Sequence, residues 1–208
     1  MDYPPQVTKD HYCRSSYDSK DRWVSYWYQM RAVLSCGAKE VLEIGPGNKT
    51  LTEALLKKGV RVTMVDTAED VGPDIIASVT DLPVRDGSYD LVLAAEVLEH
   101  LPFEEFPQAL AEIRRVTRRH AVISLPHAGY VFSLEFKIPL LRRVELIYKL
   151  PFFWKTHIFN GEHYWELGKL GYPVSKIRKI IIDNGFGIRE YGLHADDPAH
   201  YFFVLEKQ

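Results

Sequence analysis

The chain has 208 residues, of which 46% are hydrophobic and 26% are charged, so it is large enough to bury one sizeable core. A net charge of −2 gives no general electrostatic reason to bind nucleic acid. Two cysteines are too few for a disulfide framework or a zinc knuckle, which is typical of a reducing compartment. The polar first ten residues lack the apolar stretch of a signal peptide, and no window is apolar enough to span a bilayer. We therefore expect a single cytoplasmic domain without a nucleic-acid partner.

The first predicted element is an aromatic helix at residues 19–34, which carries Trp23 and Trp27 among its apolar residues. Such a helix either packs sideways on the core or acts as a lid that closes over a small-molecule site. Both interpretations stay open. We assign residues 1–37 to this N-terminal helical lid and expect residues 1–12 to be a flexible lead-in.

The chain is organised around a strand that ends in two closely spaced glycines. Val41, Leu42 and Ile44 suit a strand buried on both faces, and residues 50–58 are predicted to form a helix. Between them, Gly45 and Gly47 allow backbone conformations and a close ligand approach that a Cβ would block. A strand, a glycine turn and a helix N-terminus present free N–H groups, as in nucleotide-type cofactor sites.

The next strands deliver polar residues to the same edge. A second strand at residues 61–65 is followed by Asp66, at the position where related folds bind ribose hydroxyls. Residues 67–74 are too few for a full crossover helix, so we expect one helical turn or a loop before a third strand at residues 75–78. A nearly all-apolar fourth strand at residues 89–95 is predicted to be central in the sheet.

The second half of the chain continues this alternation with one interruption. We predict a helix at 103–116, a fifth strand at 121–125, a helix at 174–184 and a closing hairpin of two strands, at 187–193 and 200–206. Residues 130–172 bring prolines, aromatics and basic residues, and we interpret them as a cap insertion.

The cap has two competing interpretations. Its apolar residues Leu140, Leu141, Val144, Ile147 and Tyr148 fall at a spacing that predicts a helix with one apolar stripe. Because residues 136–155 are also net positive, we expect them to recognise an apolar acceptor and to make peripheral contact with a membrane. The alternative is a cap folded onto the domain or half of a dimer interface, so we expect a monomer or a homodimer.

Several segments in order resemble the class I S-adenosylmethionine-dependent methyltransferases, in particular the type 11 domain related to ubiquinone and menaquinone biosynthesis. The segments are Glu43-x-Gly45-x-Gly47, Asp81-Leu82-Pro83, and residues 87–92, 96–101 and 113–116. The resemblance covers residues 38–126, the expected cofactor-binding core; residues 173–208 supply the C-terminal helix and hairpin. It implies a three-layer α/β sandwich with a Rossmann-like, mostly parallel seven-stranded sheet, whose last strand is antiparallel. The implied activity is methyl transfer from S-adenosylmethionine to a small-molecule acceptor, and we expect a partly apolar acceptor that the cap would recognise.

The resemblance also assigns the cofactor contacts. Glu43 is expected to orient the methionine end of the cofactor and Asp66 to hold the ribose, while Asp81 accepts a hydrogen bond from adenine and the Leu82 N–H donates one. Lys49 stands where the family commonly has a third glycine, and it either reaches the cofactor carboxylate or narrows the site. The expected cofactor-binding residues are Glu43, Gly45, Pro46, Gly47, Asp66, Thr67, Asp81, Leu82, Ala95 and Glu96.

A base is required only if the acceptor loses a proton during transfer. Candidates are His100, His127, His157 and His163, with His127 best placed after the fifth strand; we assign His127 and His100 as catalytic. The string Glu96-x-x-Glu99-His100 resembles the ligand set of some magnesium- or manganese-dependent O-methyltransferases, with His127 or His163 as further ligands. The alternative is that Glu99 and His100 cap and cover the following helix, so no metal is assigned.

Two other functions remain open. A nicotinamide-dependent oxidoreductase would want a third glycine three residues after Gly47, where Thr50 stands. A non-catalytic binding or scaffold protein could keep the same fold, because a fold does not fix a function.

Overall fold

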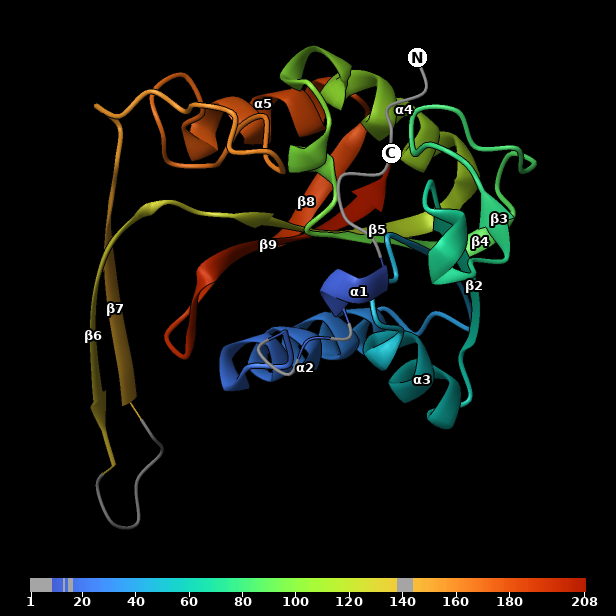
Figure 1. The fold of residues 1–208 in the computed structure, drawn as a ribbon, viewed down its shortest axis with the longest axis horizontal. Coiled ribbons are helices and arrows are strands. Elements are labelled where there is room, and N and C mark those ends of the chain that lie inside the picture. Colours follow the sequence, from blue (N-terminus) through green and yellow to red (C-terminus); the bar gives the residue numbers. More distant parts are fainter. Residues whose placement is uncertain (1–8, 13, 15–16, 138–143) are drawn as a thin grey trace.

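The protein is a three-layer α/β sandwich (Figure 1). The computed structural model describes residues 9–12, 14, 17–137 and 144–208. All strand pairings of the main sheet are parallel except those of β9, which runs antiparallel to both of its neighbours. The predicted seven-stranded sheet with an antiparallel last strand is therefore confirmed. Its strands lie in the order β3 (Ile75–Ile76), β2 (Arg61–Asp66), β1 (Glu40–Ile44), β4 (Tyr89–Ala95), β5 (Thr117–Pro126), β9 (Asp197–Lys207) and β8 (Phe186–His194).

Helices cover both faces of this sheet. In Figure 1, α1 (Lys9–Tyr12), α2 (Lys20–Ser35) and α3 (Thr50–Lys57) lie on one side, and α4 (Phe106–Val116) and α5 (Val174–Asp183) lie on the other. Within the described ranges, no helix is both long and apolar enough to cross a bilayer. The single-turn helices are η1 (Glu69–Val71), η2 (Leu98–His100) and η3 (Phe103–Glu105).

The central strand β4 shows how the sequence builds two cores. Its side chains alternate, so Leu91 and Leu93 pack with α2 and α3, whereas Val92 and Ala94 pack with α4 and α5. All four are fully buried, and each large apolar side chain contributes about 1.5–3 kcal/mol by leaving water. This two-sided burial fixes the position of the carboxyl end of β4 beside that of β1.

Several predicted boundaries shift in the structure. The third strand has only two residues, and the helix predicted from residue 103 begins as η3 and becomes α-helical at Phe106. β5 starts at Thr117, earlier than predicted, because it pairs with β4 from Tyr89 onward. The single turn η1 replaces a crossover helix, as expected. Of the flexible lead-in predicted at residues 1–12, residues 1–8 lie outside the described residues, and Lys9–Tyr12 form the short helix α1 instead.

The helix predicted in the cap is wrong. Residues 144–151 form strand β7 (Val144–Pro151), which pairs with β6 (Gly129–Phe136) in a separate two-stranded sheet. Leu140 and Leu141 lie outside the described residues. The apolar residues Leu146, Tyr148 and Leu150 of β7 alternate with the period of two that is typical of a strand. Ile147, next to Tyr148, adds the one apolar residue that made the spacing also compatible with a helix. The hairpin extends past the end of the main sheet in Figure 1 and does not fold over it as a cap.

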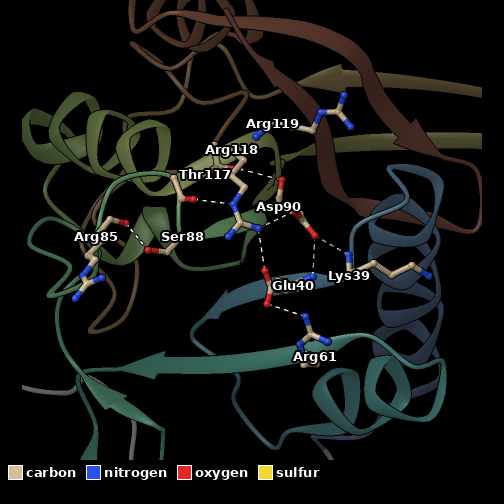
Figure 2. Close-up of polar contacts among 10 residues, drawn as sticks. Lys39, Glu40, Arg61, Arg85, Ser88, Asp90, Thr117, Arg118 and Arg119 are labelled. Carbon is tan, nitrogen blue, oxygen red and sulfur yellow. Dashed lines mark hydrogen bonds and ion pairs between the residues drawn. The ribbon is translucent and has the colours of Figure 1, made fainter.

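A polar network ties together the amino ends of the strands, at the edge opposite the glycine turn (Figure 2). Arg118 on β5 contacts Glu40 at 2.8 Å and Asp90 at 3.0 Å, and Glu40 also contacts Arg61 at 2.7 Å. The second oxygen of Asp90 accepts hydrogen bonds from the backbone N–H groups of Lys39 and Glu40, each at 3.0 Å. The network thus joins β1, β2, β4 and β5 at one end and supports their register.

Candidate functional site

The glycine turn lies at the carboxyl end of β1 and leads into α3. Gly45 and Gly47 both have left-handed backbones, with φ of 67° and 54°. A Cβ on Gly45 would lie 2.6 Å from the Cγ2 of Val97, so the turn packs directly against the end of β4. Pro46 is buried between the two glycines. The sequence at this position therefore needs glycine both for backbone conformation and for space.

Lys49 takes neither of the two positions expected for it. Its Nζ donates to the carbonyl oxygen of Gly72 at 2.7 Å, which links the start of α3 to the end of η1. The residue itself has a positive φ of 63°, uncommon for a side chain with a Cβ. Lys49 therefore fixes the loop after β2, at the expense of local backbone strain.

Glu43 lies beneath the turn. Its side chain is buried, and its Oε2 accepts a hydrogen bond from the Thr52 hydroxyl of α3 at 2.6 Å. Burial raises the pKa of Glu43 to about 7. The carboxyl group thus joins β1 to the first turns of α3 and braces the glycine turn from the protein side.

Asp66 ends β2, as predicted, beside the turn. Its Oδ1 accepts a hydrogen bond from the Ala68 N–H at 2.9 Å, and burial raises the pKa of its carboxyl group. Thr67 next to it is exposed. Hydrogen bonds from the backbone of Ala68 and Thr67 oppose this effect of burial on the pKa.

Aromatic residues of the N-terminal segment cover the glycine turn. A Cβ on Gly47 would lie 3.2 Å from the Tyr17 hydroxyl and 3.3 Å from a ring carbon of Tyr12. The Arg22 guanidinium stacks 4.0 Å above the Tyr17 ring, and the Tyr26 hydroxyl donates to Asn48 Oδ1 at 3.1 Å. Tyr12 and Tyr17 precede the predicted aromatic helix, whose Trp23 and Trp27 are exposed, so the lid interpretation of that helix stays a prediction.

The expected adenine contacts are only partly compatible with the structure. Asp81 is exposed after β3, but the Leu82 N–H donates to Glu112 Oε2 at 2.9 Å. Glu112 is in turn held by Arg115 at 2.7 Å. A carboxylate of α4 therefore already takes the N–H that was expected to donate to adenine, and the adenine contact stays a prediction.

The carboxyl end of β4 carries a chain of polar side chains, of which Ser124 and Asp197 are buried and Glu96 and His200 are half-buried. Glu96, next to Ala95, has a positive φ of 55° and accepts a hydrogen bond from the Ser124 hydroxyl at 2.8 Å. Its Oε2 lies 3.8 Å from His200 Nε2, and His200 Nδ1 donates to Asp197 Oδ1 at 2.6 Å. Burial alone would lower the pKa of His200, but the two carboxylates outweigh it and the pKa is raised. Strain at Glu96 marks this strand end as a functional candidate.

His127 lies elsewhere, under the start of the hairpin. Its ring is buried against Gly168, and Nδ1 has no hydrogen-bond partner within the described part of the chain. The Lys149 ammonium donates to the His127 carbonyl and to the Pro198 carbonyl. Burial and the Lys149 charge lower the pKa of His127 to about 4. A side chain in this environment is a poor base at neutral pH, contrary to the sequence prediction.

A third group of polar side chains lies at η2 and includes two of its residues. Glu99, His100 and His163 each offer one ligand atom within 4.8 Å of the others. Glu99 is fully buried, and neither of its carboxylate oxygens has a hydrogen-bond partner among the residues described. Burial lowers the pKa of His100 to about 4 and raises that of Glu99 well above its ordinary range. Glu96 and His127 are not members of this group.

A hydrogen bond at Nδ1 orients the ring of each histidine of this group. His100 Nδ1 donates to the Glu162 carbonyl at 3.0 Å, and His163 Nδ1 donates to Glu166 Oε1 at 3.2 Å. Lys169 holds Glu166 at 2.8 Å. A proton on each Nδ1 leaves the lone pair on Nε2, which is how metal-binding histidines are usually oriented.

His200 and Asp197 were missed from the sequence. They belong to the last strand, and antiparallel pairing with β5, which sets His200 opposite Pro126, brings them to the site. Their only sequence signal is their place at the start of a strand predicted to close the sheet. His157 supports the third group, because its Nε2 donates to the His163 carbonyl at 2.8 Å.

Residues 42–125 match the model of the methyltransferase domain family. The N-methyltransferase NodS from Bradyrhizobium japonicum WM9, in complex with S-adenosyl-L-homocysteine, superposes with a TM-score of 0.63 at 14% identity, over 96% of this chain and 95% of that one. Magnesium protoporphyrin IX methyltransferase from Synechocystis PCC 6803, with bound SAH, superposes with a TM-score of 0.60 at 16% identity, over 90% of this chain and 84% of that one.

The [4+2]-cyclase SpnF gives a TM-score of 0.58 at 12% identity, over 94% of this chain and 83% of that one. No protein with a curated description matches the sequence. Identities this low show the fold alone, and the family model matches less than half of the chain. The chain therefore has the Rossmann-like fold of these methyltransferase structures, and its residues 42–125 match the model of the methyltransferase domain.

Proposed function

We propose that this protein transfers the methyl group of S-adenosylmethionine to a small, partly apolar acceptor. The observation that carries the proposal is the left-handed glycine turn at the end of β1, inside the segment that matches the methyltransferase domain. The sulfonium of the cofactor supplies an already activated leaving group. The protein therefore has to align the acceptor with the methyl group and exclude water, which positioning alone can achieve.

Different residues around the glycine turn would bind different parts of the cofactor. The backbone at Gly45 and Gly47 would hold the methionine end of the cofactor, and Asp66 would accept hydrogen bonds from its ribose hydroxyls. Glu43 braces the turn through Thr52 and does not need to touch the cofactor. Tyr12 and Tyr17 cover the turn and exclude water.

On the acceptor side we assign proton removal to His200 instead of His127 or His100. Asp197, only 1% exposed, fixes His200 Nδ1 as the donor nitrogen, so the neutral ring carries its lone pair on Nε2. A raised pKa makes this nitrogen a better base than His127, whose pKa is about 4. An acceptor hydroxyl or amine would lose its proton to Nε2 as its oxygen or nitrogen bonds to the methyl carbon.

The donor set of Glu99, His100 and His163 fits a divalent cation. A buried carboxylate whose oxygens lack partners, beside two imidazoles with oriented Nε2 atoms, is the chemistry that manganese or a similar ion takes. A bound ion would supply Lewis-acid polarisation of an acceptor oxygen. Without one, Glu99 stays protonated in the core, as its raised pKa indicates.

Calorimetric titration of the full chain with S-adenosylhomocysteine and S-adenosylmethionine tests the proposed function. We expect saturable one-to-one binding of both and no binding of nicotinamide adenine dinucleotide. Absence of binding to either sulfur compound would favour a scaffold role. Because SpnF, a cyclase, has the same fold, binding should be followed by a search for S-adenosylhomocysteine formation with panels of hydroxylated and aminated apolar compounds.

A further inference from the structure

The β6–β7 hairpin presents one uniformly apolar face. In an antiparallel pair, directly opposite residues point to the same side. The pairs on this face are Tyr130 with Leu150, Phe132 with Tyr148, and Leu134 with Leu146, followed by Phe136. The pairs on the other face are mixed, for example Val131 with Lys149 and Ser133 with Ile147. The hairpin is therefore amphipathic, although neither strand is covered by another element of the main sheet in Figure 1.

This face is open to solvent. Phe132 is 63% exposed and Tyr148 opposite it is 64% exposed, and the next pair, Leu134 and Leu146, is similarly open at 54% and 56%. Soluble domains bury such side chains, and a contiguous apolar face left open marks a surface of interaction.

The apolar surface continues beyond the hairpin. Tyr130 packs edge-on against Phe152 at 4.8 Å, and Phe152 lies 5.9 Å from Trp154. The Lys155 ammonium sits 4.0 Å above the Phe152 ring. Aromatic rings bordered by a lysine are typical of segments that lie at the boundary between lipid headgroups and acyl chains.

The charge of this region is opposite to that of the rest of the chain. Residues 129–155 contain five basic and two acidic residues, a net charge of +3, whereas the whole chain has −2. Lys149 is turned inward to backbone carbonyls, but Lys137 and Lys155 are exposed at the two ends of the apolar surface. Such a pattern suits an anionic surface.

The charge of the hairpin argues against a second copy of this chain as the occupant. Two such faces packed together would bring like-charged segments of net charge +3 against each other, which is unfavourable. A lipid surface needs no matching partner face and accepts a narrow apolar hairpin.

We propose that the apolar face of the β6–β7 hairpin docks this protein on an anionic lipid surface. Phe132, Tyr148, Leu134 and Leu146 enter the acyl boundary, and Lys137 and Lys155 meet the lipid headgroups. Because β6 begins just after β5 ends at Pro126, docking holds the carboxyl edge of the sheet near the lipid.

Sedimentation of the full chain with vesicles tests this proposal. The vesicles are phosphatidylcholine alone or phosphatidylcholine mixed with phosphatidylglycerol, at low and high salt. We expect binding to the anionic vesicles at low salt, loss at high salt, and about fivefold weaker binding of Lys137→Glu. Phe132→Ser should bind about tenfold or more weakly. Val131→Ser, one residue away on the opposite face, is the matched control and should bind nearly as wild type.

Three results would overturn the proposal. They are no sedimentation of the wild type with anionic vesicles, equal losses in Phe132→Ser and Val131→Ser, and a dimer in light scattering that Phe132→Ser dissociates, which would make a second copy the occupant. Calorimetry with S-adenosylhomocysteine on the same proteins keeps this test separate from the proposed function, because the hairpin variants should bind that compound unchanged.

Discussion

The Thr52 hydroxyl donates to Glu43 Oε2 at 2.6 Å inside the core, and both side chains are almost completely buried. This bond joins the last residues of β1 to α3, on either side of the glycine turn. It is the nearest polar contact of Glu43, which has no cationic partner in the described ranges to offset its burial. The carboxyl group is therefore held close to its protonated form at neutral pH.

Glu43→Gln should make the protein less sensitive to pH. Because burial raises the pKa of Glu43 from 4.5 to about 7, the folded state binds a proton that the unfolded state releases between these values. The protonated group therefore contributes stability below about pH 4.5, and this contribution is lost as pH rises through about 7, by up to about 3 kcal/mol. Urea unfolding at about pH 5 and about pH 8 measures the difference.

Relative to wild type, Glu43→Gln should gain stability at the higher pH. Glu53→Gln is the control, because Glu53 follows Thr52 on α3 and its side chain is exposed. A parallel pH dependence of the wild type and Glu43→Gln would contradict the prediction.

Gly45→Ala should destabilise the turn more than Gly37→Ala. The two glycines have nearly the same φ, 67° and 68°, but a Cβ at Gly45 would meet Val97 Cγ2 at 2.6 Å, whereas one at Gly37 would meet nothing within 4 Å. Strain alone costs about 1–2 kcal/mol, and the contact adds to it at Gly45 only. Denaturant unfolding gives both losses. If the difference between them persists in a Val97→Ala background, the contact is not its cause.

The sequence predicts the parallel core far better than the acceptor side. Apolar runs and the glycine turn locate β1, α3 and β4 because burial on both faces and left-handed backbone leave a direct signature. The hairpin was predicted as a helix because Leu140 to Tyr148 satisfy helical spacing, whereas the alternation of Tyr130, Phe132 and Leu134 indicates a strand. His200 could not be assigned because only the register of β9 against β5 brings it to Glu96.

Arg118→Met should lower stability at low salt and have little effect at high salt. Arg118 bridges Glu40 and Asp90 at the amino edge of the sheet, and all three side chains are partly open to solvent (Figure 2). At about 1 M salt the screening length falls to about 3 Å, which weakens such exposed pairs. Arg119→Met is the control, since Arg119 points away from the network in Figure 2. A loss that is independent of salt would show that packing, not charge, holds this edge.

Manganese should raise the melting temperature of the wild type and not that of Glu99→Gln or His163→Ala. These variants remove a carboxylate and an imidazole from the group of three, and each should weaken binding about tenfold or more. His127→Asn tests the alternative ligand and should leave the manganese effect intact. Equal shifts in the wild type and Glu99→Gln would leave Glu99 as a protonated core residue.

The affinity of Asp66→Ala for S-adenosylhomocysteine, measured by calorimetry beside that of the wild type, tests the account most directly. Asp66 is the predicted ribose partner at the end of β2, and Glu69→Ala, an exposed acid on the following turn, is the control. Loss of a charge-assisted pair of hydrogen bonds costs about 1.5–3 kcal/mol, so the account predicts binding about ten- to a hundredfold weaker in Asp66→Ala and unchanged in Glu69→Ala. Unchanged affinity in a folded Asp66→Ala variant would contradict the assignment of this strand end as the cofactor site.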